Sequence, residues 1–134
     1  MRFKIYLIIE GNSFDPAKFN SRLDQSNVGE VIQRKNLSKA RLNSPANRLY
    51  WRSKSYEITD AECPEDKMLQ LISAVTENIK ALCKTECVHV SANIVEYLQD
   101  KDDPKGFYLS SDLITALAHL NADMDIDIVH DLKH

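Results

Sequence analysis

The end of the chain carries the pattern that most constrains its fold, a helical segment that leads directly into an alternating strand. Ser110 is a suitable helix N-cap, and the residues from there to Asn121 place leucine and isoleucine at helical spacing. Acidic and apolar residues then alternate, in the order Asp123, Met124, Asp125, Ile126, Asp127 and Ile128. Because successive strand side chains point to opposite faces, this order predicts a row of carboxylates on one face and an apolar stripe on the other. We call Asp123, Asp125 and Asp127 the acidic ladder.

Alternation and helical spacing elsewhere predict four more strands and two more helices. The strands are expected near residues 2–10, 28–34, 48–58 and 87–97. The helices are expected to begin near Pro16 and Pro64, because proline is favoured in the first helical turn. The resulting order, β-α-β-β-α-β-α-β, favours an α+β fold with a mixed, largely antiparallel sheet and helices packed on one face. With 134 residues, 43% of them apolar, the chain has the size and composition of a single domain, residues 1–134.

Charge is distributed unevenly along the chain, although the formal net charge is only −3. Between Val31 and Tyr56 there are seven basic residues and no acidic ones, whereas from Glu57 onward sixteen acidic residues accompany six lysines. Such asymmetry indicates either two faces of opposite potential or two regions that neutralise each other in the fold.

Much of the basic charge falls on one predicted strand and the loop before it. Residues 35–47 have no sustained period and are expected to form a mobile basic loop, as residues 99–106 form a solvated one. Alternation along the strand at 48–58 then predicts one cationic and aromatic face, made of Arg48, Tyr50, Arg52, Lys54 and Tyr56. We call this set the basic strand face.

Several classes of function lack support in the sequence. The apolar stretch Ile5–Ile9 is far too short for a membrane span or a signal-peptide core, so we expect a cytoplasmic protein. The three cysteines, Cys63, Cys83 and Cys87, lack the paired spacing of a disulfide framework or a zinc site. No nucleophile stands at a telling spacing from a base, and the three glycines form no phosphate loop. We therefore expect no catalytic residue, no metal and no cofactor.

Three stretches of the chain together resemble one protein family. The first is the opening strand with Gly11–Pro16 and a short helix, and the second is the strand around Trp51 with the long helix after it. The third is Gly106–Ser111, the following helix and Ala122–Ile128. Together they resemble the bacterial family called domain of unknown function 4279 (DUF4279). Residues 34–47 depart from it, because the family has a proline- and glycine-containing segment where this chain is richer in basic residues.

The resemblance implies a small cytoplasmic bacterial protein and brings no reaction and no catalytic residues with it. Families of this character often include immunity proteins, which neutralise a toxin made by neighbouring cells. By that analogy we expect a non-catalytic immunity or inhibitor protein that binds a basic toxin domain through the acidic ladder. The alternative is a nucleic-acid-binding module that uses Arg48, Tyr50, Arg52 and Lys54 to meet phosphates and stack on bases.

The acidic ladder admits two further interpretations. Its carboxylates are spaced by about 6–7 Å along the strand, which is wide for a shared metal ion or an acid–base pair. The ladder can also be a solvated or internally paired face, since opposite charges on adjacent strands attract each other. If the acidic and basic strands are neighbours, the ladder serves the fold; if they are apart, it remains the best partner surface. The sequence leaves the order of the strands open.

Overall fold

A computed structural model of the chain describes residues 2–11, 14–23, 29–33, 49–59, 63–82, 88–98 and 108–130. The described elements are β1 (Arg2–Gly11), α1 (Pro16–Ser21), β2 (Gly29–Gln33), β3 (Leu49–Ser53), β4 (Tyr56–Thr59), α3 (Pro64–Leu82), β5 (Val88–Leu98), α4 (Ser111–His119) and β6 (Asp123–His130). The loops expected at 35–47 and 99–106, together with Arg48, Cys83 and Cys87, lie outside the described residues.

The strands form one sheet with β1 at its centre. The order along the sheet is β2-β3-β1-β5-β6, and β4 pairs with β1 on the same edge as β3. All pairs are antiparallel except β5 with β6, which is parallel and is joined by a connection that contains α4. The mixed, largely antiparallel sheet and the α+β class are therefore confirmed.

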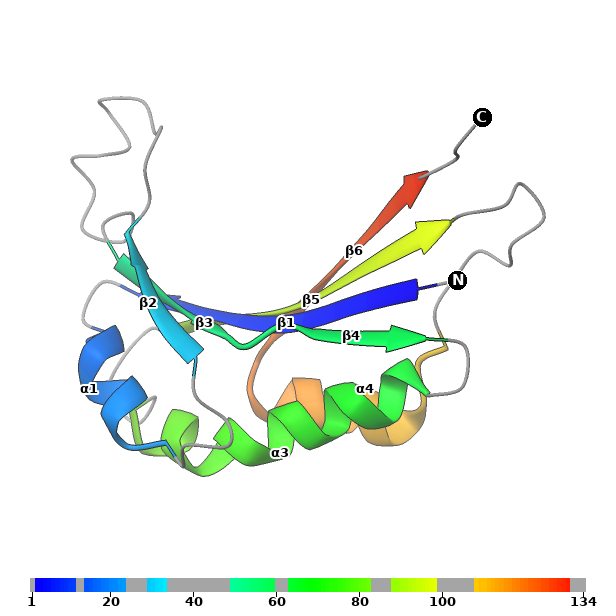
Figure 1. Cartoon of the computed structure of the whole chain (residues 1–134). Coiled ribbons are helices and arrows are strands. Elements are labelled where there is room, and N and C mark those ends of the chain that lie inside the picture. Colours follow the sequence, from blue (N-terminus) through cyan, green and yellow to red (C-terminus); the bar gives the residue numbers. More distant parts are fainter. Residues whose placement is uncertain are drawn as a thin grey trace.

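The core lies between the sheet and the three described helices, which cover one face of it (Figure 1). Strand β1 buries Phe3, Ile5, Leu7 and Ile9 on this face, as its alternation predicts. The long helix α3 contributes an apolar stripe at helical spacing, made of Met68, Leu71, Ile72, Val75 and Ile79. Ser110 caps α4 by accepting a hydrogen bond from the Leu113 backbone N–H at 3.1 Å. We call the opposite, helix-free side of the sheet the outer face.

Trp51 of β3 fixes the short helix α1 against the sheet. Its side chain is fully buried, its ring meets the edge of Phe19 at a centroid distance of 4.9 Å, and its indole N–H donates to Asn20 Oδ1 at 3.0 Å. On the neighbouring strand, Gly29 approaches so closely that a Cβ atom there would lie 2.5 Å from the Trp51 ring and 2.1 Å from the Arg52 carbonyl oxygen. Only glycine fits this position.

The strand expected at 48–58 is divided by a bulge. The pairs Ile8–Arg52 and Ile5–Tyr56 enclose two residues of β1 but three of the partner, Ser53–Ser55. One extra residue interrupts the ladder and reverses the faces that follow it. At the bulge the Ser53 hydroxyl accepts a hydrogen bond from the Leu7 backbone N–H at 2.8 Å, and so satisfies a buried donor that the interrupted ladder leaves unpaired.

The reversal moves Tyr56 off the basic strand face. Paired residues share a face, so Tyr56 lies with Ile5 on the helix side of the sheet, where it packs against the core. The ammonium group of Lys67, on α3, lies 4.6 Å from the centre of its ring. The prediction that Tyr56 continues the face of Tyr50 and Arg52 was wrong. It assumed unbroken alternation along the strand, and the extra residue of the bulge shifts Tyr56 to the other face.

The two serines at the bulge provide a matched test of this geometry. We expect Ser53→Ala to lower the free energy of unfolding by about 1–3 kcal/mol, because the buried Leu7 N–H loses its acceptor. Ser55 accepts a hydrogen bond from Arg52 Nη2 at 3.0 Å near the surface, and we expect Ser55→Ala to cost about 0.5 kcal/mol or less. Urea denaturation measures both variants, and equal losses would contradict the proposed role of Ser53.

Candidate functional site

The outer face of the sheet is the candidate functional site, because none of the described helices covers it. Figure 1 shows that the sheet bends, with β2 and β3 rising at one end and β5 and β6 at the other, so that the outer face lies on the inside of the bend.

The acidic ladder lies along one edge of this face. Asp123, Asp125 and Asp127 of β6 pair with Ser91, Asn93 and Val95 of β5, which are the outward residues of that strand. All three carboxylates are exposed. Because paired residues share a face, this register places the three carboxylates on one face, as the alternation in the sequence predicts. The Asp123 carboxylate contacts His89, with 3.3 Å between Oδ2 and Nε2. Asp125 and Asp127 make no salt bridge or hydrogen bond with the part of the chain that the structure describes.

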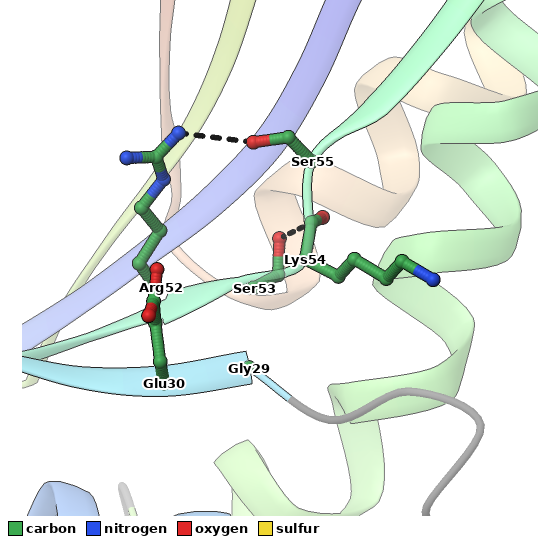
Figure 2. A pocket seen from close by; sticks show the side chains of 6 residues that line it. All are labelled: Gly29, Glu30, Arg52, Ser53, Lys54 and Ser55. Carbon is green, nitrogen blue, oxygen red and sulfur yellow. Dashed lines mark hydrogen bonds between the residues drawn. The ribbon is translucent and has the colours of Figure 1, made fainter.

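The basic strand face is smaller than the sequence predicts. Tyr50 and Arg52 lie on the outer face of β3, whereas Arg48 falls outside the described residues. Lys54 is exposed at the bulge, and its side chain extends away from that of Arg52 (Figure 2). These two cations border a hollow of about 300 Å³ that is also lined by Gly29, Glu30, Ser53 and Ser55. Glu30 places a carboxylate beside Arg52, so the hollow is not uniformly basic.

Strand order answers the question that the sequence leaves open. The basic strand β3 and the acidic strand β6 are separated by β1 and β5. With adjacent strands about 4.8 Å apart, the two strands lie about 14 Å from each other across the sheet. They share the outer face but are not neighbours, so cross-strand pairing does not neutralise the ladder.

Tyr6 of β1 stands between the two charged regions. Its half-buried ring lies under the Arg52 guanidinium, with 4.5 Å from Cζ to the ring centre, and the Lys4 ammonium is 6.0 Å from the same centre. Tyr6 was not predicted from the sequence as a site residue. The sequence does place Tyr6, an aromatic residue, on the face of the first strand opposite the core. That position indicates a site residue only once the strand order shows that β1 is central and lies beside Arg52.

Comparison with known proteins gives one result. The family model described as "Domain of unknown function (DUF4279)" matches residues 1–131. The chain belongs to the DUF4279 family. No curated protein and no solved structure matches it significantly.

Among the described residues of this DUF4279 protein, no group of three or more His, Cys, Asp or Glu side chains is placed to hold a metal ion. No helix among them is long and apolar enough to cross a membrane. Cys63 is a free, exposed thiol just before α3. What the outer face does offer is a charge separation, with cations around Tyr6 and carboxylates along β6.

The pKa of Tyr6 depends on the charged residues on both sides of it. Burial raises the pKa of the Tyr6 phenol above its ordinary value of 10.0, Arg52 opposes the rise, and the carboxylates of Asp127 and Asp125 add to it. The stability that the neutral phenol contributes is therefore complete below pH 10 and is lost as pH rises through the higher pKa of the folded state.

This arrangement predicts pKa changes of opposite sign. We expect Asp125→Asn combined with Asp127→Asn to lower the pKa of Tyr6, and Arg52→Gln to raise it further. The measurement is a ring-carbon NMR titration, with Tyr6→Phe used to assign the signal. A pKa that is unmoved by the double substitution would show that the ladder lies too far from Tyr6 to act on it.

Proposed function

We propose that this DUF4279 protein is a cytoplasmic, non-catalytic immunity-type protein that binds and neutralises a basic protein toxin through the acidic ladder. The observation that carries the proposal is the position of Asp125 and Asp127, which are exposed on an edge strand and unpaired by any described residue. Carboxylates held in a row on a rigid strand present a fixed negative surface, as recognition of a basic partner requires.

The separation between the ladder and the described cations of the outer face supports the proposal. Lys4 of β1 lies level with Asp127 two strands away, or about 10 Å, and Arg52 of β3 lies three strands away, or about 14 Å. Both distances exceed the screening length of about 8 Å at physiological salt. Arg52 is in addition engaged by Tyr6 and Ser55, so its charge is directed toward the middle of the sheet. The negative potential of β6 is therefore available to a partner.

A simpler role for the ladder is protection of the sheet edge. Charged side chains on an edge strand discourage pairing with the edges of other proteins, and this role needs no partner. It differs from the proposed role in one measurable respect, because protection of the edge affects aggregation while partner docking affects association with a specific toxin. The two roles are compatible, and binding measurements test only the second.

We expect neutralisation of the ladder to weaken binding chiefly through slower association. The variant carries Asp123→Asn, Asp125→Asn and Asp127→Asn, and the ligand to be tested is the protein domain encoded by the reading frame next to this gene, which the proposal expects to be a toxin. We expect the association rate constant to fall by about tenfold or more at low salt, with a smaller change in dissociation, because exposed charges steer encounter. Biolayer interferometry over a series of salt concentrations measures both rates.

The control changes the net charge equally at other sites. Asp66, Glu77 and Asp112 are exposed on the helices, and Asp66→Asn, Glu77→Gln and Asp112→Asn remove the same charge from the covered side of the sheet. Equal effects of the two triple variants would mean that total charge matters and the ladder does not. Failure of the protein to restore growth of cells that express the adjacent toxin domain would disprove the immunity function.

The alternative proposal, nucleic-acid binding, has support from Tyr50 and Arg52 on the outer face. It predicts salt-sensitive binding of single-stranded RNA or DNA that is lost on neutralising Arg48, Arg52 and Lys54. It also predicts that the triple Asp→Asn variant binds nucleic acid more tightly, the opposite of its effect on a basic toxin. Fluorescence anisotropy with labelled oligonucleotides decides this, and no binding at low salt removes the alternative.

A further inference from the structure

The edge of β6 that faces away from β5 is the feature that the proposed function leaves unused. Strand β6 has eight residues, and among the described residues it pairs with β5 alone. Alternate residues of such a strand direct their backbone N–H and C=O groups outward, where another strand can pair with them. The other strands with an unpaired edge are shorter, since β2 has five residues and β4 has four.

Apolar side chains on the helix side of β6 are left incompletely covered. Ile126 and Ile128 are 39% and 44% exposed, although the residues beside them on β5, Ile94 and Glu96, are buried. Met124, nearer the start of the strand, packs against the core. Figure 1 shows β6 rising away from the helix layer along its length. The core therefore ends at β5 over the second half of β6, and one further strand would extend it.

We infer that the free edge of β6 accepts an extended segment of the protein partner as an added strand, in which basic residues alternate with apolar ones. The alternation follows from β6 itself, since a strand placed beside it shares both of its faces. On the outer face the added strand meets the acidic ladder and needs basic side chains. On the helix side it meets Ile126 and Ile128 and needs apolar ones. This inference rests on the proposed function and specifies how its partner is recognised.

A second copy of this chain does not fit the same edge. Antiparallel pairing of two β6 strands would bring the acidic ladders of both copies alongside each other on the outer face. Like charges directly opposite on adjacent strands are destabilising, and three carboxylates from each copy would repel. The carboxylates thus exclude the self-pairing that Ile126 and Ile128 would otherwise favour. The acidic ladder of β6 therefore favours a partner strand with basic side chains over a second copy of this chain.

Model peptides test this mode of binding even while the toxin is unidentified. The probe is an octapeptide that alternates lysine with valine, titrated into the protein by isothermal calorimetry. A second peptide has the same composition with its lysines and valines in two blocks. We expect the alternating peptide to bind at least about tenfold more tightly, because only it matches both faces of β6.

Backbone methylation separates strand addition from charge attraction. In an extended peptide the N–H groups of the lysines point to one edge and those of the valines to the other. We therefore synthesise one peptide with every lysine N-methylated and one with every valine N-methylated. Strand addition in a single direction, parallel or antiparallel to β6, predicts that one of the two loses about tenfold or more in affinity while the other keeps it, since only one set of N–H groups then faces β6. Equal affinities of the two methylated peptides would overturn the inference.

Substitutions in the protein complete the test. Ile126→Thr with Ile128→Thr keeps β-branched side chains and removes the apolar surface, and we expect it to weaken the alternating peptide about tenfold. The matched control is Ile114→Thr on α4, where the isoleucine is 52% exposed and we expect no change. A control variant that weakens binding as much as the double variant would show that the effect is not local to β6.

The outcomes distinguish this inference from the proposed function. If the methylated peptides bind alike and the toxin domain still requires the acidic ladder, strand addition is wrong and the proposed function stands. If one methylated peptide loses binding but no toxin is neutralised, strand addition stands and the proposed function is wrong. No binding of the alternating peptide, or a stable dimer at micromolar concentration that Ile128→Thr disperses, overturns the inference whatever the toxin result.

Discussion

The pairing of β1 along both of its edges is the constraint on which the rest of this structure depends. On one edge β1 runs beside β5 from Arg2 to Gly11, and on the other it holds both β3 and β4. Its helix-facing side chains form the middle of the core, so the strand is fixed by hydrogen bonds at its edges and by packing on one face. The outer face of β1 is thereby held open between two charged strands. Tyr6 therefore lies on the outer face between these two strands.

Several expectations that depend on local spacing alone were correct. The alternation of Asp123–Ile128 determines which carboxylates share a face, because side-chain direction within a strand depends only on spacing. The same holds for the buried residues of β1 and for Ser110 as the N-cap of α4. These features required no knowledge of which strands are neighbours. The fold class followed from the order of elements along the chain.

Two kinds of information were not available from spacing. The order of strands depends on long-range packing, so the sequence left open whether the ladder and Arg52 are neighbours, and with it the position of Tyr6. The bulge at Ser53–Ser55 depends on register with β1, and the sequence alternates across it without a visible break. Tyr56 was therefore assigned to the wrong face. Of the residues predicted for the basic strand face, Tyr50 and Arg52 lie on the outer face, whereas Tyr56 lies on the helix side.

The burial of Trp51 has a consequence for how this protein is observed in solution. It is the single tryptophan of the chain, and its indole is enclosed by Phe19, hydrogen bonded to Asn20 and overlain by Gly29. Its fluorescence therefore monitors the docking of α1 on the sheet. Because β6 lies three positions away in the sheet order, events at that edge leave this emission largely unchanged. The molecule thus carries an intrinsic optical probe of its folding that is separated from the surface assigned to its partner.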